Sequence, residues 1–100
     1  MTVTVLVDAE NVRRSVWPNI DRRELVERAE AWAEHEGHRV LVVFEAEESA
    51  DDRIARWVEQ AGGPYWLVTS DRELRERAGG GAERVLGGGA FARMLRDLAV

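Results

Sequence analysis

Residues 2–7, TVTVLV, followed directly by Asp8, form the stretch that decides the fold. The segment is rich in β-branched residues and almost continuously apolar, as is typical of a strand buried on both faces of a parallel sheet. An acid that directly follows such a strand is costly to desolvate, and no helix cap that needs it is evident in the sequence. We therefore expect a central strand with a functional carboxylate, Asp8, at its carboxyl end.

Three further apolar segments have the length and composition of strands, and helical patterns separate them. These strands are expected at residues 39–44 (RVLVVF), 65–68 (YWLV) and 83–86 (ERVL). Helix start signals stand at Asp21, at Ser49 and, as an S-x-x-E capping box, at Ser70 with Glu73, and Gly37 is a helix stop signal. The last helix carries Phe91, Met94, Leu95 and Leu98 on one face. Residues 8–20 are expected to be mainly loop because Pro18 interrupts any helix there.

This alternation predicts an α/β fold in which helices cover both faces of a parallel sheet. We expect one domain, residues 1–100, with a three-layer Rossmann-like architecture and four strands in the order 2-1-3-4. Ligands of such sheets bind beyond the carboxyl ends of the strands, where the strand order switches. Asp8 ends the first strand and Asp71 follows the third, so the two aspartates should flank one crevice.

Several carboxylates that converge from different elements are what metal-dependent phosphodiester chemistry requires, because Mg²⁺ prefers carboxylate oxygens. The candidate ligands are Asp8, the adjacent pair Asp51 and Asp52, and Asp71. A structural role is the alternative for the later acids, since any acid in the first turn of a helix is stabilised by the macrodipole. Asp8 fits that alternative least well.

Other candidates would contact a substrate rather than a metal. Arg13, Arg14, Arg53 and Arg72 each lie within a few residues of a proposed acid and could hold phosphates, although exposed, solvated arginines fit the pattern equally well. Trp17, in the proline-containing loop, could stack on a nucleobase. His35 and His38 flank a helix end, where histidines usually cap carbonyls, and the glycine runs match no phosphate-binding fingerprint.

The composition excludes several kinds of catalytic and metal site. The chain has no cysteine, which excludes disulfides and thiolate sites, and all 14 basic residues are arginine, which excludes a catalytic lysine. The net charge of −5 is unusual for a nucleic-acid binder, but it includes the acids of the proposed site. No segment predicts a signal peptide or a membrane span, so a cytoplasmic protein without membrane contacts is expected.

Four ordered segments together resemble a known family. They are VLVDAENV (residues 5–12) with Trp17–Pro18, LVVF (41–44), SADDRI (49–54) and LVTSDREL (67–74), and VLGGGAF (85–91) closes the series. The set is similar to NYN domains of the PIN-like nuclease superfamily, in particular the YacP-like bacterial branch. The family often has Gly and an aromatic residue after the first Asp, where this chain has Ala9 and Glu10. It also often has Asp where this chain has Glu45.

The resemblance implies a metal-dependent endoribonuclease that hydrolyses RNA with Mg²⁺ or Mn²⁺. Residue by residue, it implies that Asp8 is the first metal ligand and that Asn11 supports it. Asp52, with Asp51 beside it, and Asp71 would complete the cluster, and Ser70 would be a supporting hydroxyl at the substrate. Single-stranded RNA is the expected partner, and the small core suggests a homodimer.

Two other functions share this layout. A catalytically inactive module that binds RNA or protein is the main alternative, because Glu10 adds a carboxylate that could either ligate metal or repel substrate. Glu45 likewise could either ligate metal or block activity. A phospho-acceptor receiver domain would also place an acid at a strand end, but receivers use a lysine that this chain lacks.

Overall fold

The computed structural model describes residues 2–98, so residues 1, 99 and 100 of the predicted domain lie outside the described part. The elements in chain order are β1 (Thr4–Asp8), α1 (Ala9–Arg14), α2 (Arg22–Glu36), β2 (Arg39–Val43), α3 (Ala50–Ala61), β3 (Tyr65–Val68), α4 (Arg72–Ala78), β4 (Arg84–Leu86) and α5 (Gly88–Leu98). Within residues 2–98, no helix is both long enough and apolar enough to cross a bilayer.

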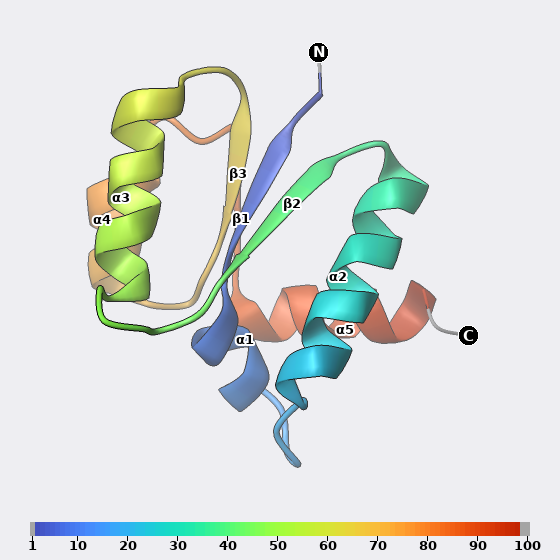
Figure 1. Cartoon of the computed structure of the whole chain (residues 1–100). Coiled ribbons are helices and arrows are strands. Elements are labelled where there is room, and N and C mark those ends of the chain that lie inside the picture. The colour runs from blue at the N-terminus through green and yellow to red at the C-terminus, as the bar shows by residue number, and fades with distance from the viewer. Residues whose placement is uncertain (1, 99–100) are drawn as a thin grey trace.

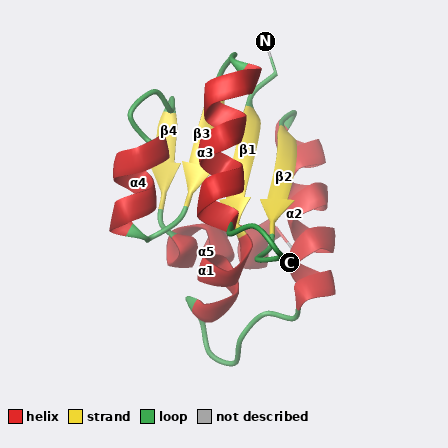
Figure 2. Cartoon of the chain, turned by 60° about the vertical axis from the view of Figure 1, so that its left-hand side comes forward, coloured by secondary structure: helices red, strands yellow, loops and turns green. Residues whose placement is uncertain are grey.

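The four strands form one parallel sheet in the order β2-β1-β3-β4, as the sequence predicts. Helices α3 and α4 cover one face of the sheet, and α2 covers the other (Figure 1). Helices α1 and α5 lie toward the carboxyl ends of the strands (Figure 2). The fold is therefore the expected three-layer, Rossmann-like arrangement, and β1 lies between β2 and β3 at the switch in strand order.

Local signals set most of the element boundaries. The side chain of Asp21 accepts hydrogen bonds from the first turn of α2, and Gly37 ends that helix with a positive φ of 75°. Ser49 caps α3 by accepting from the amide of Asp52, 3.1 Å away. These three positions confirm the sequence prediction.

Two local predictions are wrong. A loop was expected at residues 9–14, but these residues form the helix α1 directly after β1. The helix can form because it ends before Pro18, which therefore cannot interrupt it. Helix α4 is capped by Asp71 rather than by Ser70: the Asp71 side chain accepts from the amide of Leu74 at 3.2 Å. The hydroxyl of Ser70 instead accepts from the amide of Gly88 at 2.9 Å.

Side chains alternate across β1 and divide the core in two. Val5 and Val7 belong to one cluster, with buried residues of α1, α2 and α5, whereas Leu6 packs on the other face with residues of α3 and α4. Asp8, two residues after Leu6, continues on the α3/α4 side. The alternation therefore directs the carboxylate of Asp8 toward the beginnings of α3 and α4.

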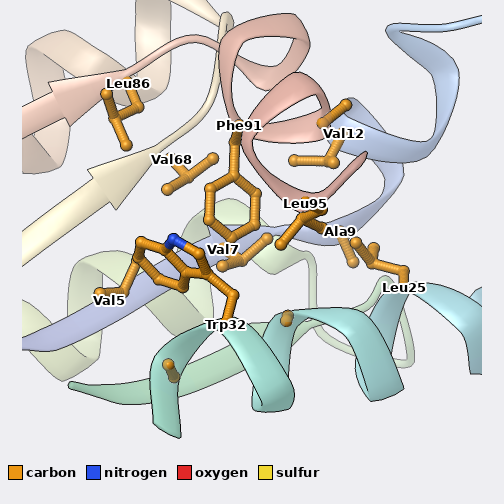
Figure 3. Close-up of a cluster of buried hydrophobic side chains, with 13 residues drawn as sticks. Val5, Val7, Ala9, Val12, Leu25, Trp32, Val68, Leu86, Phe91 and Leu95 are labelled. Atoms are coloured by element: carbon orange, nitrogen blue, oxygen red, sulfur yellow. The ribbon is translucent and has the colours of Figure 1, made fainter. Parts of the chain in front are cut away.

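The larger cluster is built around Phe91, which is fully buried between the sheet and α2 (Figure 3). Its ring meets the indole of Trp32 edge to face, with 5.0 Å between the ring centroids. Val7 and Val68, from adjacent strands, lie beside it (Figure 3). This packing fixes α5, and with it Gly88, against the carboxyl end of the sheet.

We predict that Phe91→Ala lowers the free energy of unfolding by about 3–5 kcal/mol, because it removes a fully buried aromatic ring and leaves a cavity. Trp17→Ala is the matched control: Trp17 is 90% exposed, so its loss should change stability by less than about 0.5 kcal/mol. Urea unfolding followed by circular dichroism measures both. Equal stability losses in the two variants would contradict this description of the core.

Candidate functional site

A pocket of about 380 Å³ opens at the carboxyl edge of the sheet and collects three of the four predicted metal-binding acids together with Asn11 and Ser70. Its walls come from the end of β1, from α1, from the loop after β2 and from the beginnings of α3 and α4. The residues that line it are Asp8, Glu10, Asn11, Arg14, Ser15, Glu45, Asp51, Ser70 and Asp71. Asp8 and Asp71 thus flank one crevice, as expected from the strand order, and this pocket is called the acid pocket below.

Asp8 is buried, with 6% of its surface exposed, and is held by Thr69. The Thr69 hydroxyl donates to Asp8 Oδ2 over 2.8 Å and accepts from the backbone amide of Asp71 over 3.0 Å. The register explains this contact: Val7 pairs with Val68, so the next residues along the two strands are Asp8 and Thr69. Thr69 therefore links the first and last aspartates of the pocket, a role that the sequence analysis missed.

Of the two adjacent aspartates in α3, the structure brings Asp51 into the pocket and leaves Asp52 outside it. Asp52 is exposed and pairs instead with Arg77 of α4, with 2.9 Å between Oδ1 and Nη1. Asp51 lies three residues before the buried Ile54 and seven before the half-buried Val58, so it shares their face of the helix. That spacing was a signal in the sequence that could have separated the two acids.

Asn11 and Ser70 hold three segments together at the rim of the pocket. The side-chain oxygen of Asn11 accepts from the amide of Ser70 at 2.8 Å, and the Ser70 hydroxyl accepts from the amide of Gly88. A Cβ atom on Gly88 would lie 2.5 Å from the same Asn11 oxygen, so only glycine allows this close approach. The second glycine run thus contributes a close contact at the site in addition to a turn.

Glu10 also borders the pocket, but arginines surround its carboxylate. Oε1 accepts from Arg13 Nη1 at 2.6 Å and lies 3.6 Å from Arg14 Nη2, while Oε2 lies 3.6 Å from Arg22 Nε. Oε2 is buried and has no hydrogen-bond partner among residues 2–98. These contacts offset the charge that Glu10 would otherwise add to the pocket. Glu45, by contrast, lines the pocket from an exposed loop.

The structure does not bring the remaining predicted substrate contacts into the acid pocket. Arg13 is held by Glu10 and by the carbonyl of Ile20, at 2.7 Å, and Arg53 donates to the carbonyl of Phe44 at 3.1 Å. The side chain of Arg72 is 94% exposed and points to Glu76. Trp17 borders a separate pocket. Of the arginines considered in the sequence analysis, Arg14 is the one that lines the acid pocket.

The pKa values of the pocket acids Asp8 and Asp51 are shifted in the opposite direction from the pKa of the neighbouring Asp52. Burial raises the pKa of Asp8, and the charges of Asp51, Asp71 and Glu45 raise it further, against the hydrogen bond from Thr69. Burial also raises the pKa of Asp51, followed by the charges of Asp71 and Glu45.

Asp52 behaves in the opposite way, because hydrogen bonds from Arg77 and Ser49 lower its pKa. Within residues 2–98, no arginine or histidine lies within ion-pairing distance of Asp8, Asp51 or Asp71. The pocket acids thus repel one another, and the charge of Arg77, beyond ion-pairing distance, offsets this only in part at Asp51.

The donor set suits a hard divalent cation, although the described side chains do not form a closed metal cage. Between residues 2 and 98, no group of three or more acidic or histidine side chains is arranged so that it could hold a metal ion. Mg²⁺, however, usually keeps several waters and is bound by one or two carboxylates together with substrate phosphates. Asp8, Asp51 and Asp71 fit that mode in their chemistry and in their unpaired charge.

Comparison with protein-family models, with curated proteins and with solved structures finds no match, so the interpretation of the site rests on its own residues.

We predict opposite stability effects for two Asp→Asn variants. A raised pKa means that the charged form of Asp8 costs stability, and this cost grows as the pH rises from roughly 4 through the raised pKa of the folded protein. Asp8→Asn should therefore be more stable than wild type at pH 7. The lowered pKa of Asp52 gives stability that is present above roughly pH 4 and lost in acid, so Asp52→Asn should be less stable at pH 7.

Urea unfolding of both variants and of wild type, repeated from pH 7 to pH 3, measures these differences. Both should shrink toward zero in acid, where the wild-type carboxyls become neutral. A lower stability of Asp8→Asn than of wild type at pH 7 would show that the carboxylate is stabilising the fold and would contradict the argument.

Proposed function

We propose that the chain is a metal-dependent endoribonuclease that uses Mg²⁺ or Mn²⁺ to hydrolyse RNA phosphodiester bonds. One observation carries the proposal: three aspartates from three elements, Asp8, Asp51 and Asp71, face one pocket with no basic partner within ion-pairing distance in the described chain. Mutual repulsion of these charges destabilises the protein unless a bound cation offsets it. Such a cluster of acids is therefore a candidate functional site. The sequence motifs that we interpret as NYN-like lead to the same proposal.

Each residue of the pocket has a distinct part in this proposal. Asp8, Asp51 and Asp71 would hold the metal, which when bound offsets charge on the phosphoryl oxygens and activates water for attack. The Thr69 hydroxyl orients Asp8 by donating to its carboxylate. The same hydroxyl fixes the loop that contains Asp71 by accepting from the Asp71 backbone amide. Asn11 holds that loop from the other side through Ser70. The chain thus supplies carboxylates whose positions are set before substrate arrives.

Arg14 is the residue best placed to meet the RNA backbone at this pocket. It lines the pocket, and 71% of its side chain is exposed, so its guanidinium is accessible to solvent. Glu10, 3.6 Å away, keeps it near the rim. Guanidinium groups bind phosphate oxygens in a bidentate manner.

Hydrolysis by activated water would leave a 5′-phosphate and a 3′-hydroxyl.

A catalytically inactive RNA- or protein-binding module is the second candidate. The buried Glu10 favours it, because a further carboxylate at the pocket adds negative charge where a phosphate would sit. Three arginines within 3.6 Å of that carboxylate reduce this effect. The two candidates differ in one measurable property, which is cleavage that depends on divalent metal.

We predict that wild-type protein cleaves a labelled single-stranded RNA in Mn²⁺ or Mg²⁺ and that Asp8→Asn reduces the rate at least 100-fold. The reason is that loss of groups that only support a metal ligand already costs about 10–100-fold, and Asp8 is proposed to be a ligand itself. Gel analysis of the products over time measures the rates.

Asp51→Asn and Asp52→Asn form a matched pair of neighbours in the same helix turn. Asp51→Asn should lose activity, whereas Asp52→Asn should retain it, because Asp52 lies outside the pocket and is paired with Arg77. Equal activity of wild type and Asp8→Asn would point to a contaminating nuclease and remove the proposal. Metal-independent RNA binding without cleavage would favour the inactive module.

A further inference from the structure

A second pocket, of about 260 Å³, lies between the α1–α2 loop and the helices α2 and α5. Its floor is apolar, since Val16 and Ile20 of the loop pack against the main core cluster and Ala92 and Leu95 of α5 are buried. The floor is therefore part of the folded core and does not depend on a mobile side chain. Trp17 and Pro18 form the outer wall of the pocket.

Trp17 differs from the other tryptophans of the chain. It is 90% exposed, whereas Trp32 is buried and Trp57 and Trp66 are half-buried against the two core clusters. An indole that is held beside a pocket and open to solvent on most of its surface offers a flat surface for a planar ligand. Sequence reasoning identified Trp17 as a possible stacking residue, and the structure adds the pocket beside it.

The charges of this pocket differ from those of the rest of the molecule. Arg28 and Arg96 line it together with a single acid, Glu24, in a chain whose net charge is −5. Glu24 pairs with Arg28 over 3.3 Å. The pocket thus combines an apolar floor, an exposed indole and a positive rim, and this combination suits a nucleobase followed by a phosphate.

The two pockets are lined in part by consecutive residues of the chain. Arg14 and Ser15 line the acid pocket, and the next two residues, Val16 and Trp17, line the second one. An RNA strand whose scissile phosphate lay at the acid pocket would reach Trp17 by following this short segment. This segment makes a turn at Ser15 and bends through Val16–Pro18 directly after α1.

We infer that the second pocket holds one unpaired base of the RNA strand, stacked on Trp17, with a neighbouring phosphate at Arg28 and Arg96. The inference rests on the proposed function and deepens it. Stacking on an indole requires a free base face, and in a duplex the neighbouring base pairs cover both faces. The pocket would therefore select single-stranded over double-stranded RNA.

The test measures binding without cleavage. A fluorescein-labelled decauridylate is titrated with protein in EDTA at low salt, and fluorescence anisotropy gives the affinity. Trp17→Ala should weaken binding about 10-fold, within the range of about 5- to 150-fold typical for the loss of one stacked base. Arg39→Ala is the control for Arg28→Ala and Arg96→Ala, because Arg39 is exposed at the start of β2, at the opposite edge of the sheet.

A set of decauridylates that each lack one base makes the test specific. Loss of a single base should weaken binding by wild type at one position and leave binding by Trp17→Ala unchanged there. Trp17→Phe should retain part of the effect. Because Trp17 is exposed, these variants should fold like wild type, and their thermal melts verify this.

The outcomes separate this inference from the proposed function. Equal RNA affinity of wild type and Trp17→Ala would overturn the base pocket, even if metal-dependent cleavage is observed. Base-dependent binding through Trp17 without any cleavage would support the pocket and remove the nuclease. A change in sedimentation of Trp17→Ala with unchanged RNA affinity would assign Trp17 to a contact between two copies of the chain, and would also overturn the inference.

Discussion

The parallel pairing of β1 with β3 is the constraint on which the rest of the structure depends. Its register sets Val7 opposite Val68, so that the chain continues into Asp8 on one strand and Thr69 on the next. The helices that follow parallel strands begin at this same edge, which brings the start of α3 and the start of α4 to the side of the sheet that Asp8 faces. A shift of one residue in that register would turn Asp8 away from both helices.

The same geometry explains why the site costs stability. Asp8 sits at the end of a fully buried strand, and its charge is opposed by desolvation and by the other acids of the pocket. The hydrogen bond from Thr69 compensates only part of this, because the net effect still raises the pKa of Asp8. Asp52, one residue from Asp51, is paired with Arg77 and shows the arrangement expected of an acid that stabilises the fold. The two neighbours therefore differ in their surroundings: burial and nearby acids raise the pKa of Asp51, whereas hydrogen bonds from Arg77 and Ser49 lower that of Asp52.

Much of the fold could be predicted from the sequence because its signals are local. Apolar runs marked the strands, and Asp21, Gly37 and Ser49 marked helix ends that the structure confirms. The expected strand order, 2-1-3-4, led in turn to the expectation that Asp8 and Asp71 flank one crevice, and the structure has both. Helix α1 was missed because its six residues are too few to show a helical period.

The site was predicted less completely, because side-chain partners depend on contacts between distant segments. Thr69 meets Asp8 across 61 positions of sequence, and no local pattern marks that hydrogen bond. The arginines show the same limit: Arg13 and Arg53 lie near acids in the sequence, yet backbone carbonyls and Glu10 bind them in the structure. Asp51 could have been distinguished from Asp52 by the apolar stripe of α3, since adjacent residues point roughly 100° apart around a helix.

The central claim is that a divalent cation binds where Asp8, Asp51 and Asp71 meet, and paramagnetic broadening by Mn²⁺ tests it most directly. Amide signals of the ¹⁵N-labelled protein would be followed by NMR as Mn²⁺ is added. The account predicts that signals of residues 8–11, 51 and 69–71 broaden first and that this selectivity is lost in Asp8→Asn. Broadening that is spread over the exposed acids of α2, such as Glu30 and Glu34, or that is unchanged in Asp8→Asn, would contradict it.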